Sequence, residues 1–508
     1  MSESKQVYAY DIETLKSYFS AAFIDIDTGE RFLFEVYRVK SKKVNDIRSL
    51  LKFLRTCKGM IGYNNLFFDY PVLHLLLTAE EFVTSLRIPQ LLELIYERAQ
   101  DLIKKRRTFK YKVPDYKVII PQLDLIEMNY FNSKAKFVSL KGLEFVMRYH
   151  NVQDMPYSHK FRIRTTAQAK EIADYNFNDV DATLMFYKKC EAGLELRRGL
   201  SRKYKMNLMN APETKLAKEI FAVHLLEEMK ISRQELNKMR TKRDIIDVGK
   251  QVILPVIKFE NENLNKLLEY FKLQKVNKLK GFFKDIQKGS TGYNLLKEIS
   301  TKSFINKAGT IECLNVEFNN HVYMFGNGGI HSKVEGKAYV CNEDEIIVDA
   351  DVASYYPNLC IKLGFKPEHM GEIFLKVYEY IYNERQKFPK GTIENAIMKL
   401  ILNSSFGQSG NEHSYLFDLL MTISICINGQ LLLMMLNEQI VKIGGIITSS
   451  NTDGSSILIK RDKVDELNEI FKWWQELTGL TLEFANYTAQ YYKDVNRMRL
   501  NLVNCLES

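Results

Sequence analysis

Cysteine is scarce and scattered in this sequence, and the beginning of the chain lacks an apolar stretch. The seven cysteines among 508 residues form no Cys-x-x-Cys pair. This spacing excludes the usual zinc modules and a secreted disulfide scaffold. The N-terminal MSESKQVYAYDIE does not have the apolar core of a signal peptide. We therefore expect a soluble protein of a reducing cytosol.

An excess of one charge sign is also missing. The 72 basic and 62 acidic residues leave a net charge of +10, which is compatible with nucleic-acid binding without requiring it. One uncharged stretch, Leu419–Leu436, has the length of a membrane span, but Asn428 and Gln430 in its middle favour a buried core helix. The length and the 46% hydrophobic content predict two to four domains with real cores.

Two aspartates lie at the end of a predicted strand. In Ile346–Asn358 (IIVDADVASYYPN) the alternation places apolar residues on one face and Asp349 and Asp351 on the other. About a hundred residues later, Asn451–Gly454 (NTDG) lies between two apolar runs and predicts a hairpin. Taken alone, these are a solvated edge strand and a turn residue. If the hairpin pairs beside the first strand, Asp351 and Asp453 converge and can hold two Mg²⁺ ions for phosphoryl transfer.

The N-terminal third carries acidic residues on three predicted elements. These are a strand over Val7–Thr14, a strand that runs into a helix over Met60–Leu77, and a helix over Ala167–Cys190. Alone, each acid has an ordinary structural explanation, such as a favourable place at a helix N-terminus. Together they make a two-metal hydrolytic site plausible, with a tyrosine that orients the attacking water. The residues are Asp11, Glu13, Asp69, Tyr175 and Asp179.

Two consecutive helices are predicted between the aspartates. An apolar stripe ends at Arg385, and Pro389 breaks that helix. The next helix, Ile393–Phe406, carries Lys399, Asn403 and Phe406 on one face. Such a pair can grip a triphosphate with Arg385 and Lys399, or it can be a helical hairpin whose basic side chains extend along its surface.

The N-terminal set resembles the three exonuclease motifs of family B DNA polymerases. The matching stretches are Asp11-Ile-Glu13, Asn65-Leu-Phe-Phe68-Asp69 and Tyr175-x-x-x-Asp179. The resemblance implies a ribonuclease H-like α/β domain with 3′–5′ exonuclease activity. It implies that Asn65 and Phe68 touch the primer's 3′ end and that Tyr175 positions the water. The implied metal ligands are Asp11, Glu13, Asp69 and Asp179.

The later elements resemble polymerase motifs of the same family, in the family's order. Asp351–Pro357, Lys399–Gly407 and Asn451–Asp453 are similar to motifs A, B and C, and Phe325–His331 is similar to the Tyr-x-Gly-Gly motif with phenylalanine for tyrosine. The resemblance implies that Asp351, Asp453 and the Val352 carbonyl bind metal, and that Gly328 and Gly329 line the template path. The implied nucleotide-binding residues are Val352, Ser354, Tyr355, Tyr356, Arg385, Lys399, Asn403 and Phe406.

Within that set, the resemblance assigns separate tasks. Tyr356 would lie under the incoming sugar and exclude a ribose 2′-hydroxyl. Arg385 and Lys399 would neutralise the triphosphate, while Asn403 and Phe406 would line the pocket of the new base pair.

The resemblance implies an α+β multidomain protein that adds dNTPs to a primer on template DNA. The cofactor would be Mg²⁺, with two ions per site, and Mn²⁺ could substitute for it. The motifs resemble those of bacteriophage members of the family, which would place the protein in the cytoplasm of a host cell. The implied segments are an exonuclease domain over 1–190, a connecting DNA-path region over 191–320, a first palm part over 321–366, fingers over 367–415 and a second palm part over 416–508.

The sequence departs from the family pattern at several places. Asn451 stands where the family usually has aspartate and Gly454 where it has serine. Only 48 residues separate Asp351 from Lys399, so priming by a terminal protein is not indicated. No thumb follows Asp453, which leaves three alternatives open. A second polypeptide supplies the thumb, the chain is an exonuclease with impaired polymerase activity, or it is a non-catalytic DNA-binding subunit.

Two basic stretches lie between the two sets of motifs. They are Asn237–Arg243 and Lys272–Lys288, the second with aromatic residues among its lysines. Either can follow a DNA backbone or form a solvated face.

Overall fold

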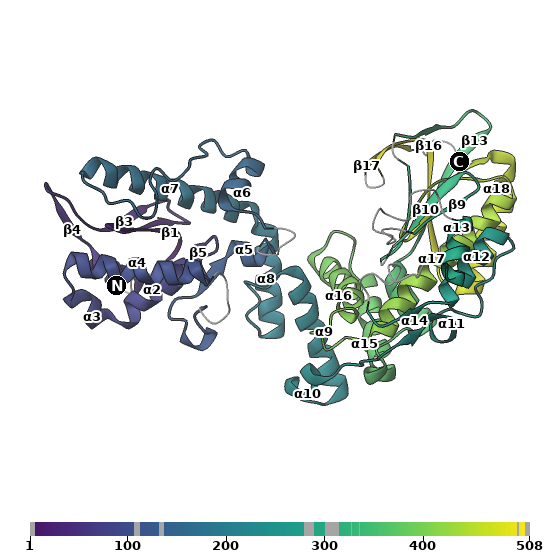
Figure 1. The fold of residues 1–508 in the computed structure, drawn as a ribbon, viewed down its shortest axis with the longest axis horizontal. Coiled ribbons are helices and arrows are strands. Elements are labelled where there is room, and N and C mark those ends of the chain that lie inside the picture. Colours follow the sequence, from purple (N-terminus) through teal and green to yellow (C-terminus); the bar gives the residue numbers. More distant parts are fainter. Residues whose placement is uncertain are drawn as a thin grey trace. The chain divides into compact units, whose positions relative to one another are not determined.

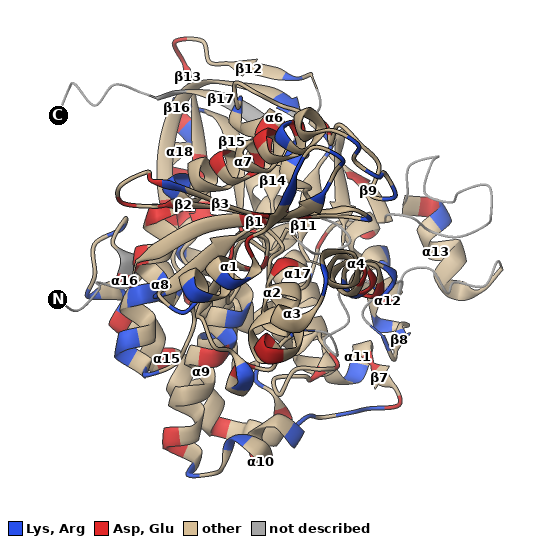
Figure 2. Cartoon of the chain, turned by 90° about the vertical axis from the view of Figure 1, so that its left-hand side faces the viewer, with Lys and Arg blue, Asp and Glu red and all other residues tan. Residues whose placement is uncertain are grey.

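The chain divides into two compact units, Met1–Leu216 and Ala217–Ser508, which we describe separately (Figure 1). The computed structural model describes residues 6–105, 112–131, 137–278, 289–299, 314–326, 328–334, 336–494 and 497–502. Both units mix helices with sheets, as the predicted α+β class requires. Acidic and basic residues are interspersed along the helices (Figure 2), in keeping with a net charge that comes from both signs.

The first unit is built on one six-stranded sheet with the order β4-β3-β2-β1-β5-β6. The first four strands form an antiparallel meander, and β5 and β6 run parallel to β1. The turn that follows β2 is stabilised by the Asp25 carboxylate, which accepts hydrogen bonds from the Asp27 and Thr28 amides at 2.9 and 2.7 Å. The strands are β1 (Val7–Leu15), β2 (Tyr18–Asp25), β3 (Arg31–Arg38), β4 (Lys43–Asn45), β5 (Gly59–Gly62) and β6 (Gln122–Asp124).

Helices cover both faces of this sheet. On one face, Ala9 and Ile24 pack against Val180 of α7, while on the other face Tyr10 and Ile12 belong to the apolar core that also contains α2 and α4. Figure 1 shows α7 on one side of the strands and α2 with α4 on the other. The helices are α1 (Ile47–Leu54), α2 (Asp69–Thr78), α3 (Glu80–Ser85), α4 (Ile88–Lys104), α5 (Leu125–Met128), α6 (Leu140–Met147), α7 (Thr166–Lys189) and α8 (Glu191–Tyr204).

The second unit is built on a nine-stranded sheet in which all neighbouring strands are antiparallel. Its order is β12-β16-β13-β15-β14-β11-β10-β9, and β17 pairs with β16. The predicted hairpin β14–β15 therefore does pair beside β13. The strands are β9 (Leu314–Phe318), β10 (His321–Phe325), β11 (Ile330–Ser332), β12 (Ala338–Val340), β13 (Glu345–Val352), β14 (Ile446–Asn451), β15 (Gly454–Lys460), β16 (Leu482–Asp494) and β17 (Arg497–Leu502).

The predicted helical hairpin is formed by α15 and α16. The Tyr378 hydroxyl of α15 donates to the Leu402 carbonyl of α16 at 2.6 Å, and the Asn395 amide caps the Arg385 and Phe388 carbonyls. The remaining elements are α9 (Glu213–Met229), α10 (Arg233–Lys238), β7 (Ile246–Asp247), α11 (Val248–Gln251), α12 (Glu262–Lys272), β8 (Lys275–Val276), α13 (Thr291–Ile299), α14 (Tyr355–Leu363), α15 (Gly371–Gln386), α16 (Ile393–Ser409), α17 (Leu419–Lys442) and α18 (Val464–Thr478).

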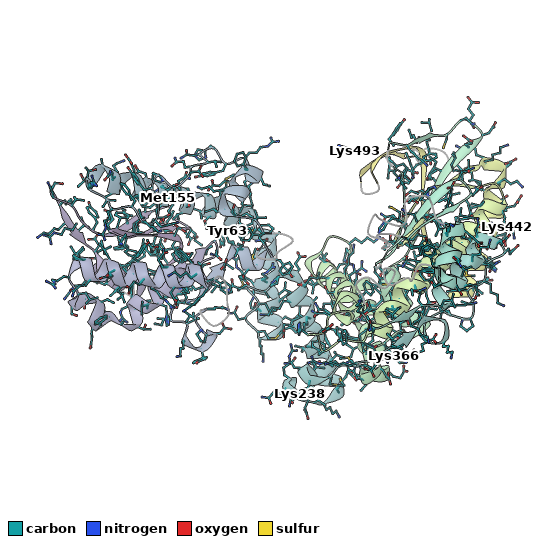
Figure 3. All side chains as sticks on the ribbon, viewed as in Figure 1. Tyr63, Met155, Lys238, Lys366, Lys442 and Lys493 are labelled. Atoms are coloured by element: carbon teal, nitrogen blue, oxygen red, sulfur yellow. The ribbon has the colours of Figure 1, made fainter. Side chains whose placement is uncertain are left out.

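Helix α17 contains the uncharged stretch, and it is long and apolar enough to cross a membrane by composition alone. Its most apolar eighteen-residue window is 94% buried inside the second unit. The amides of Asn428 and Gln430 donate to the Val252 and Gly326 carbonyls at 2.8 and 3.0 Å. The exposed end carries Lys442 (Figure 3), which pairs with Glu260 at 2.7 Å. The prediction of a buried core helix is confirmed.

The basic stretch Asn237–Arg243 is used for packing within the second unit. The Arg243 guanidinium contacts the carboxylates of both Asp418 and Glu368, and Arg240 donates to the Glu412 carbonyl at 3.1 Å. Arg243 is therefore unavailable to a DNA backbone in this structure. The second basic stretch, Lys272–Lys288, lies largely outside the described residues.

Candidate active sites

Three carboxylates of the first unit meet on the α7 face of its sheet. Asp11 and Glu13 are two residues apart on β1, so both point to that face, and α7 brings Asp179 over them. Ligand oxygens of the three residues all lie within 4.8 Å of one another. Residues 168 positions apart in sequence are thus brought to one point because α7 packs along β1 and β2.

Asp69 is the fourth acid of this cluster. It begins α2 and accepts a hydrogen bond from the Ile12 amide, between the two β1 acids, at 3.3 Å. Burial raises the pKa of Asp69 to about 7. Burial, followed by the charges of Asp69, Glu13 and Asp179, raises the pKa of Asp11 well above its usual range. We call Asp11, Glu13, Asp69 and Asp179 the acidic cluster.

The acidic cluster has too little positive charge of its own to keep four carboxylates ionised. Lys141, at the start of α6, pairs with Asp179 at 3.0 Å and with the buried Glu144 at 3.5 Å. Even so, burial outweighs Lys141 and the pKa of Asp179 stays raised. A set of four oxygen donors with this charge deficit fits hard divalent cations such as Mg²⁺.

Lys141 was not among the residues that sequence reasoning selected. Its ammonium lies 4.8 Å from the centre of the Tyr175 ring, so it joins the tyrosine to Asp179. Burial, and then Asp179, raise the pKa of Tyr175, which stays protonated and can donate from its hydroxyl. No local pattern could have marked Lys141 as part of the site, because Asp179 and Tyr175 lie more than thirty residues away from it in sequence.

The two residues expected to touch the primer have different surroundings. Phe68 immediately precedes Asp69, is half-buried, and packs against the apolar core that contains α2 and α4. Asn65 is fully buried, and its amide donates to Gln122 at 2.9 Å. In this structure the Asn65 side chain is therefore a packing element beneath the cluster.

The second site lies in the second unit, where β13 pairs with β15. Asp351 of β13 is in register with Gly454, the residue after Asp453, and the Val352 amide donates to the Asp453 carbonyl at 2.7 Å. Asp351, on β13, and Asp453, in the turn that leads into β15, are thus held beside each other. Both residues are partly open to solvent at this end of the strands, and both are partly desolvated by the protein around them.

Gly454 is the position at which these strands approach most closely. A Cβ atom there would lie 1.9 Å from an Asp351 carboxylate oxygen and 2.7 Å from the Ala350 carbonyl oxygen. A serine at this position, as in the family pattern, would meet the same obstruction. The close approach of β13 therefore explains why this chain has glycine at position 454, where the family pattern has serine.

The turn that carries Asp453 is braced by the glycine-rich segment. The Thr452 amide donates to the Ile330 carbonyl at 2.7 Å, and His331 Nδ1 lies 2.8 Å from Asn451 Oδ1. A Cβ on Gly329 would come within 2.9 Å of Thr452. Gly329, which resembles a template-path residue, therefore also permits close packing against this turn. The side chain of Asn451 is held by His331.

Several acids share the second site. Burial, and then the charges of Asp349, Asp453 and Glu483, raise the pKa of Asp351 to about 6. Asp349 is half-buried and accepts a hydrogen bond from Ser456, while Glu483 of β16 is in register with Asp351. Burial also raises the pKa of Asp453. These oxygen donors, too, fit a divalent cation.

Basic residues of the helical hairpin reach the same strand ends. Arg385 Nη1 donates to the Ser354 hydroxyl at 3.1 Å, and Nε donates to Asn395 at 3.3 Å. Lys399 on α16 is exposed and lowers the pKa of Asp453 through its charge, against the larger effect of burial. Ser354 has a left-handed backbone (φ 48°, ψ 55°), a conformation that non-glycine residues rarely adopt.

Tyr356 joins three of the predicted segments. Its ring stacks on Phe406 of α16, with centroids 4.4 Å apart and planes 12° apart, and its hydroxyl donates to the Gly328 carbonyl. Burial raises the pKa of Tyr356, so the hydroxyl stays a donor. The aromatic pair forms a platform beside the second site.

The other three predicted nucleotide-binding residues are divided between core and surface. Tyr355 is buried, and its hydroxyl donates to the Gly429 carbonyl of α17 at 2.5 Å. Val352 is buried as well, with its backbone amide bonded to Asp453. Asn403 is exposed on α16, one turn from Lys399. Tyr355 thus anchors α14 rather than offering its side chain to a ligand.

Comparison with known proteins gives little support from sequence. No protein-family model and no curated protein matches the chain. Among solved structures, the chain is similar to the family B DNA polymerase of the hyperthermophilic archaeon Pyrobaculum calidifontis, with a TM-score of 0.45 and 12% identity over 98% of this chain. It spans 60% of that protein's length. A likeness of this degree does not by itself establish a shared fold, so the function is inferred below from the residues of the two sites.

Proposed function

We propose that the chain is a template-directed DNA polymerase with a 3′–5′ exonuclease site. The observation that supports the polymerase half is the pairing of β13 with β15, which brings Asp351 beside Asp453 in the turn that precedes β15. Arg385 and Lys399 bring positive charge to the same place from the helical hairpin. Carboxylates flanked by cationic side chains are the arrangement that nucleotidyl transfer from a nucleoside triphosphate needs.

In the polymerase reaction, the primer 3′-hydroxyl attacks the α-phosphate in line and pyrophosphate leaves. Arg385, which Ser354 and Asn395 hold in place, and Lys399 neutralise the triphosphate. Tyr356 and Phe406 supply an apolar platform for the sugar and the new base pair. Positioning and charge neutralisation account for most of such catalysis, because the phosphoryl transition state needs little covalent help.

In the exonuclease reaction, water attacks the terminal phosphodiester at the acidic cluster. The protonated Tyr175 hydroxyl orients that water, and Phe68 packs against the 3′-terminal nucleotide. The positive charge of Lys141 lowers the pKa of Asp179, against the larger effect of burial. When bound by the carboxylates of either site, divalent cations would neutralise them and polarise the phosphate oxygens.

A second candidate function is a 3′–5′ exonuclease whose polymerase half is inactive. It is favoured by one observation: among the described residues, Asp11, Glu13 and Asp179 are the group of three or more possible ligands that already lies together. A role in bacteriophage DNA replication in the host cytoplasm, and a second polypeptide that supplies a thumb, belong to the proposal and rest on the sequence resemblance.

Paired variants test the two halves separately. Asp351→Ala with Asp453→Ala should abolish primer extension while digestion continues, and Asp11→Ala with Glu13→Ala should abolish digestion while extension continues. Extension by the first variant would refute the polymerase assignment. Undiminished digestion by the second would refute the exonuclease assignment. Absence of extension from the unaltered chain, with digestion intact, would select the second candidate.

A further inference from the structure

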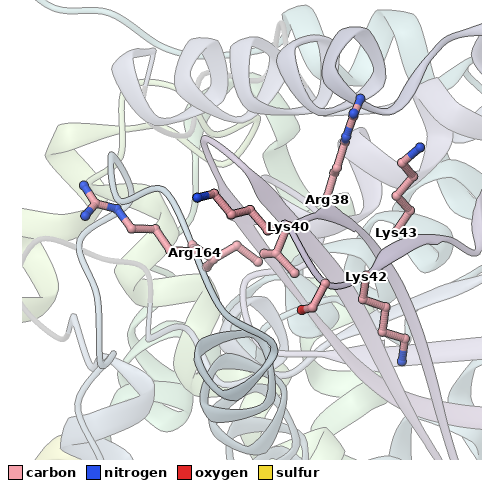
Figure 4. Close-up of a pocket in the computed structure, with 8 residues that line it drawn as sticks. Arg38, Lys40, Lys42, Lys43 and Arg164 are labelled. Carbon is pink, nitrogen blue, oxygen red and sulfur yellow. The ribbon is translucent and has the colours of Figure 1, made fainter.

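A basic groove lies on the first unit, between the turn that joins β3 to β4 and the segment before α7. It has a volume of about 840 Å³ and contains five cationic side chains and no carboxylate among its eight lining residues. Figure 4 shows Lys40 and Arg164 extending to one side from these two segments, while Arg38 and Lys43 extend together to another. The lining residues are Arg38, Val39, Lys40, Ser41, Lys42, Lys43, Ile163 and Arg164.

The fold aims these charges outward. Val39 and Ile163 are buried in one apolar cluster with Tyr18 and Tyr37, so the residues on either side of them must face solvent. The turn is closed by the Val39 amide, which donates to the Lys42 carbonyl at 2.9 Å. The Ile163 amide donates to the Ser17 hydroxyl at 2.8 Å. The groove is therefore a fixed part of the unit.

The positive charge of the groove has no ion-pair partner in the part of the chain that the structure describes. The positive charge of Lys42 lowers the pKa of the nearby Glu35, but burial of Glu35 raises that pKa by more. An adjoining hollow of about 420 Å³ adds Lys16 and Arg162, with Glu93 and Glu97 on its far side. A recess with this excess of cations concentrates polyanions.

The lining also distinguishes between kinds of polyanion. It has no aromatic ring on which a base could stack, and its two apolar residues are buried, so none can insert into a membrane. What remains is recognition of backbone charge. We propose that the basic groove binds the phosphodiester backbone of a nucleic acid, without sequence preference, at a site separate from the acidic cluster.

The position of the groove gives this binding a use. Lys16, in the adjoining hollow, is three residues beyond Glu13, a separation of roughly 10 Å along a strand. A strand held in the groove would thus start in the same unit as the acidic cluster, although the hollow is lined by α4 and the cluster lies on the α7 face of the sheet. The inference stands without the proposed catalytic function, since it concerns affinity alone.

Binding of a fluorescent oligothymidylate to the full chain, measured by anisotropy in EDTA over a range of salt concentrations, tests the proposal. The groove variant replaces Lys40, Lys42, Lys43 and Arg164 with Gln. The control replaces four exposed lysines of the same unit, Lys52, Lys104, Lys188 and Lys189, with Gln and so removes the same charge. The groove variant should bind at least tenfold more weakly, and its salt slope should fall by up to about 3, roughly 0.7 for each phosphate that is no longer neutralised.

Several results would overturn the proposal. Equal losses in the two variants would mean that net charge alone attracts the strand. An unchanged groove variant, or groove-dependent binding to phosphatidylserine vesicles with none to the oligonucleotide, would contradict it too. Should the groove variant unfold, a photoreactive oligothymidylate on the unaltered chain must crosslink to residues 38–43 or 164, and crosslinks confined to other segments would refute the site. A chain that binds in this way yet neither cuts nor extends would overturn only the proposed function.

Discussion

Replacement of Gly454 by alanine would push β13 and β15 apart at the second site. The new Cβ would lie 1.9 Å from the Asp351 carboxylate, 2.7 Å from the Ala350 carbonyl and 2.8 Å from the Asp351 Cα, whereas real Cβ contacts below 3.0 Å essentially never occur. The carboxylate can rotate away, but the two backbone atoms cannot. Rotation of the Asp351 carboxylate and separation of the two strands would each move Asp351 relative to Asp453.

The expected costs follow from these contacts. Overpacking at a rigid site should lower the free energy of unfolding by about 1–3 kcal/mol. A displacement on the order of 1 Å between the two carboxylates should reduce nucleotide addition by roughly 100-fold. Digestion should be unaffected, because the acidic cluster lies in the other compact unit.

Denaturant unfolding and single-nucleotide extension of a primer measure the two effects. Gly199→Ala is the matched control, since a Cβ at this position of α8 meets no atom within 4 Å, and alanine should stabilise a helix by about 0.5–1 kcal/mol. If Gly454→Ala extends primers at the normal rate, close approach of the two strands is not what positions Asp351.

Three further predictions concern single side chains. Asp69→Asn removes a buried carboxyl group whose pKa rises from 3.8 to about 7 on folding. In EDTA, the unaltered protein should therefore lose stability as the pH rises from about 3.8 to about 7. At pH 8 the variant should be more stable than the unaltered protein by roughly 2–4 kcal/mol in denaturant unfolding. Lys141→Gln removes the cation that lowers the pKa of Asp179, so the pH profile of digestion should move to higher pH; an unmoved profile would contradict this. Tyr356→Ala should raise ribonucleotide incorporation by roughly 10–200-fold, whereas Tyr356→Phe, which keeps the stack on Phe406, should not; equal effects would mean that the ring is not what excludes the ribose.

The elements that could be predicted are those whose pattern is local. Period-two alternation located β1 and β13, the Asp-Gly dipeptide located the β14–β15 turn, and the i, i+4 spacing placed Tyr175 and Asp179 on one face of α7. The sequence alone could not predict that β13 pairs with β15, because the register between strands a hundred residues apart depends on the whole sheet.

The features that could not be predicted depend on contacts distant in sequence. Lys141 meets Asp179 only because α6 packs beside α7. Asn65 and Tyr355 lie within motif-like stretches, yet their side chains are buried and bond to Gln122 and Gly429. The basic groove, likewise, joins segments about 120 residues apart; the sequence shows the basic run Arg38–Lys43 (RVKSKK), but not that Arg164 lies beside it.

The most direct test is incubation of a labelled primer–template with the purified chain and Mg²⁺, first without and then with dNTPs. We predict shortening of the primer without dNTPs and template-dependent extension when they are added. Failure to shorten or extend the primer in Mg²⁺ or Mn²⁺, by a chain shown to be folded, would contradict the account.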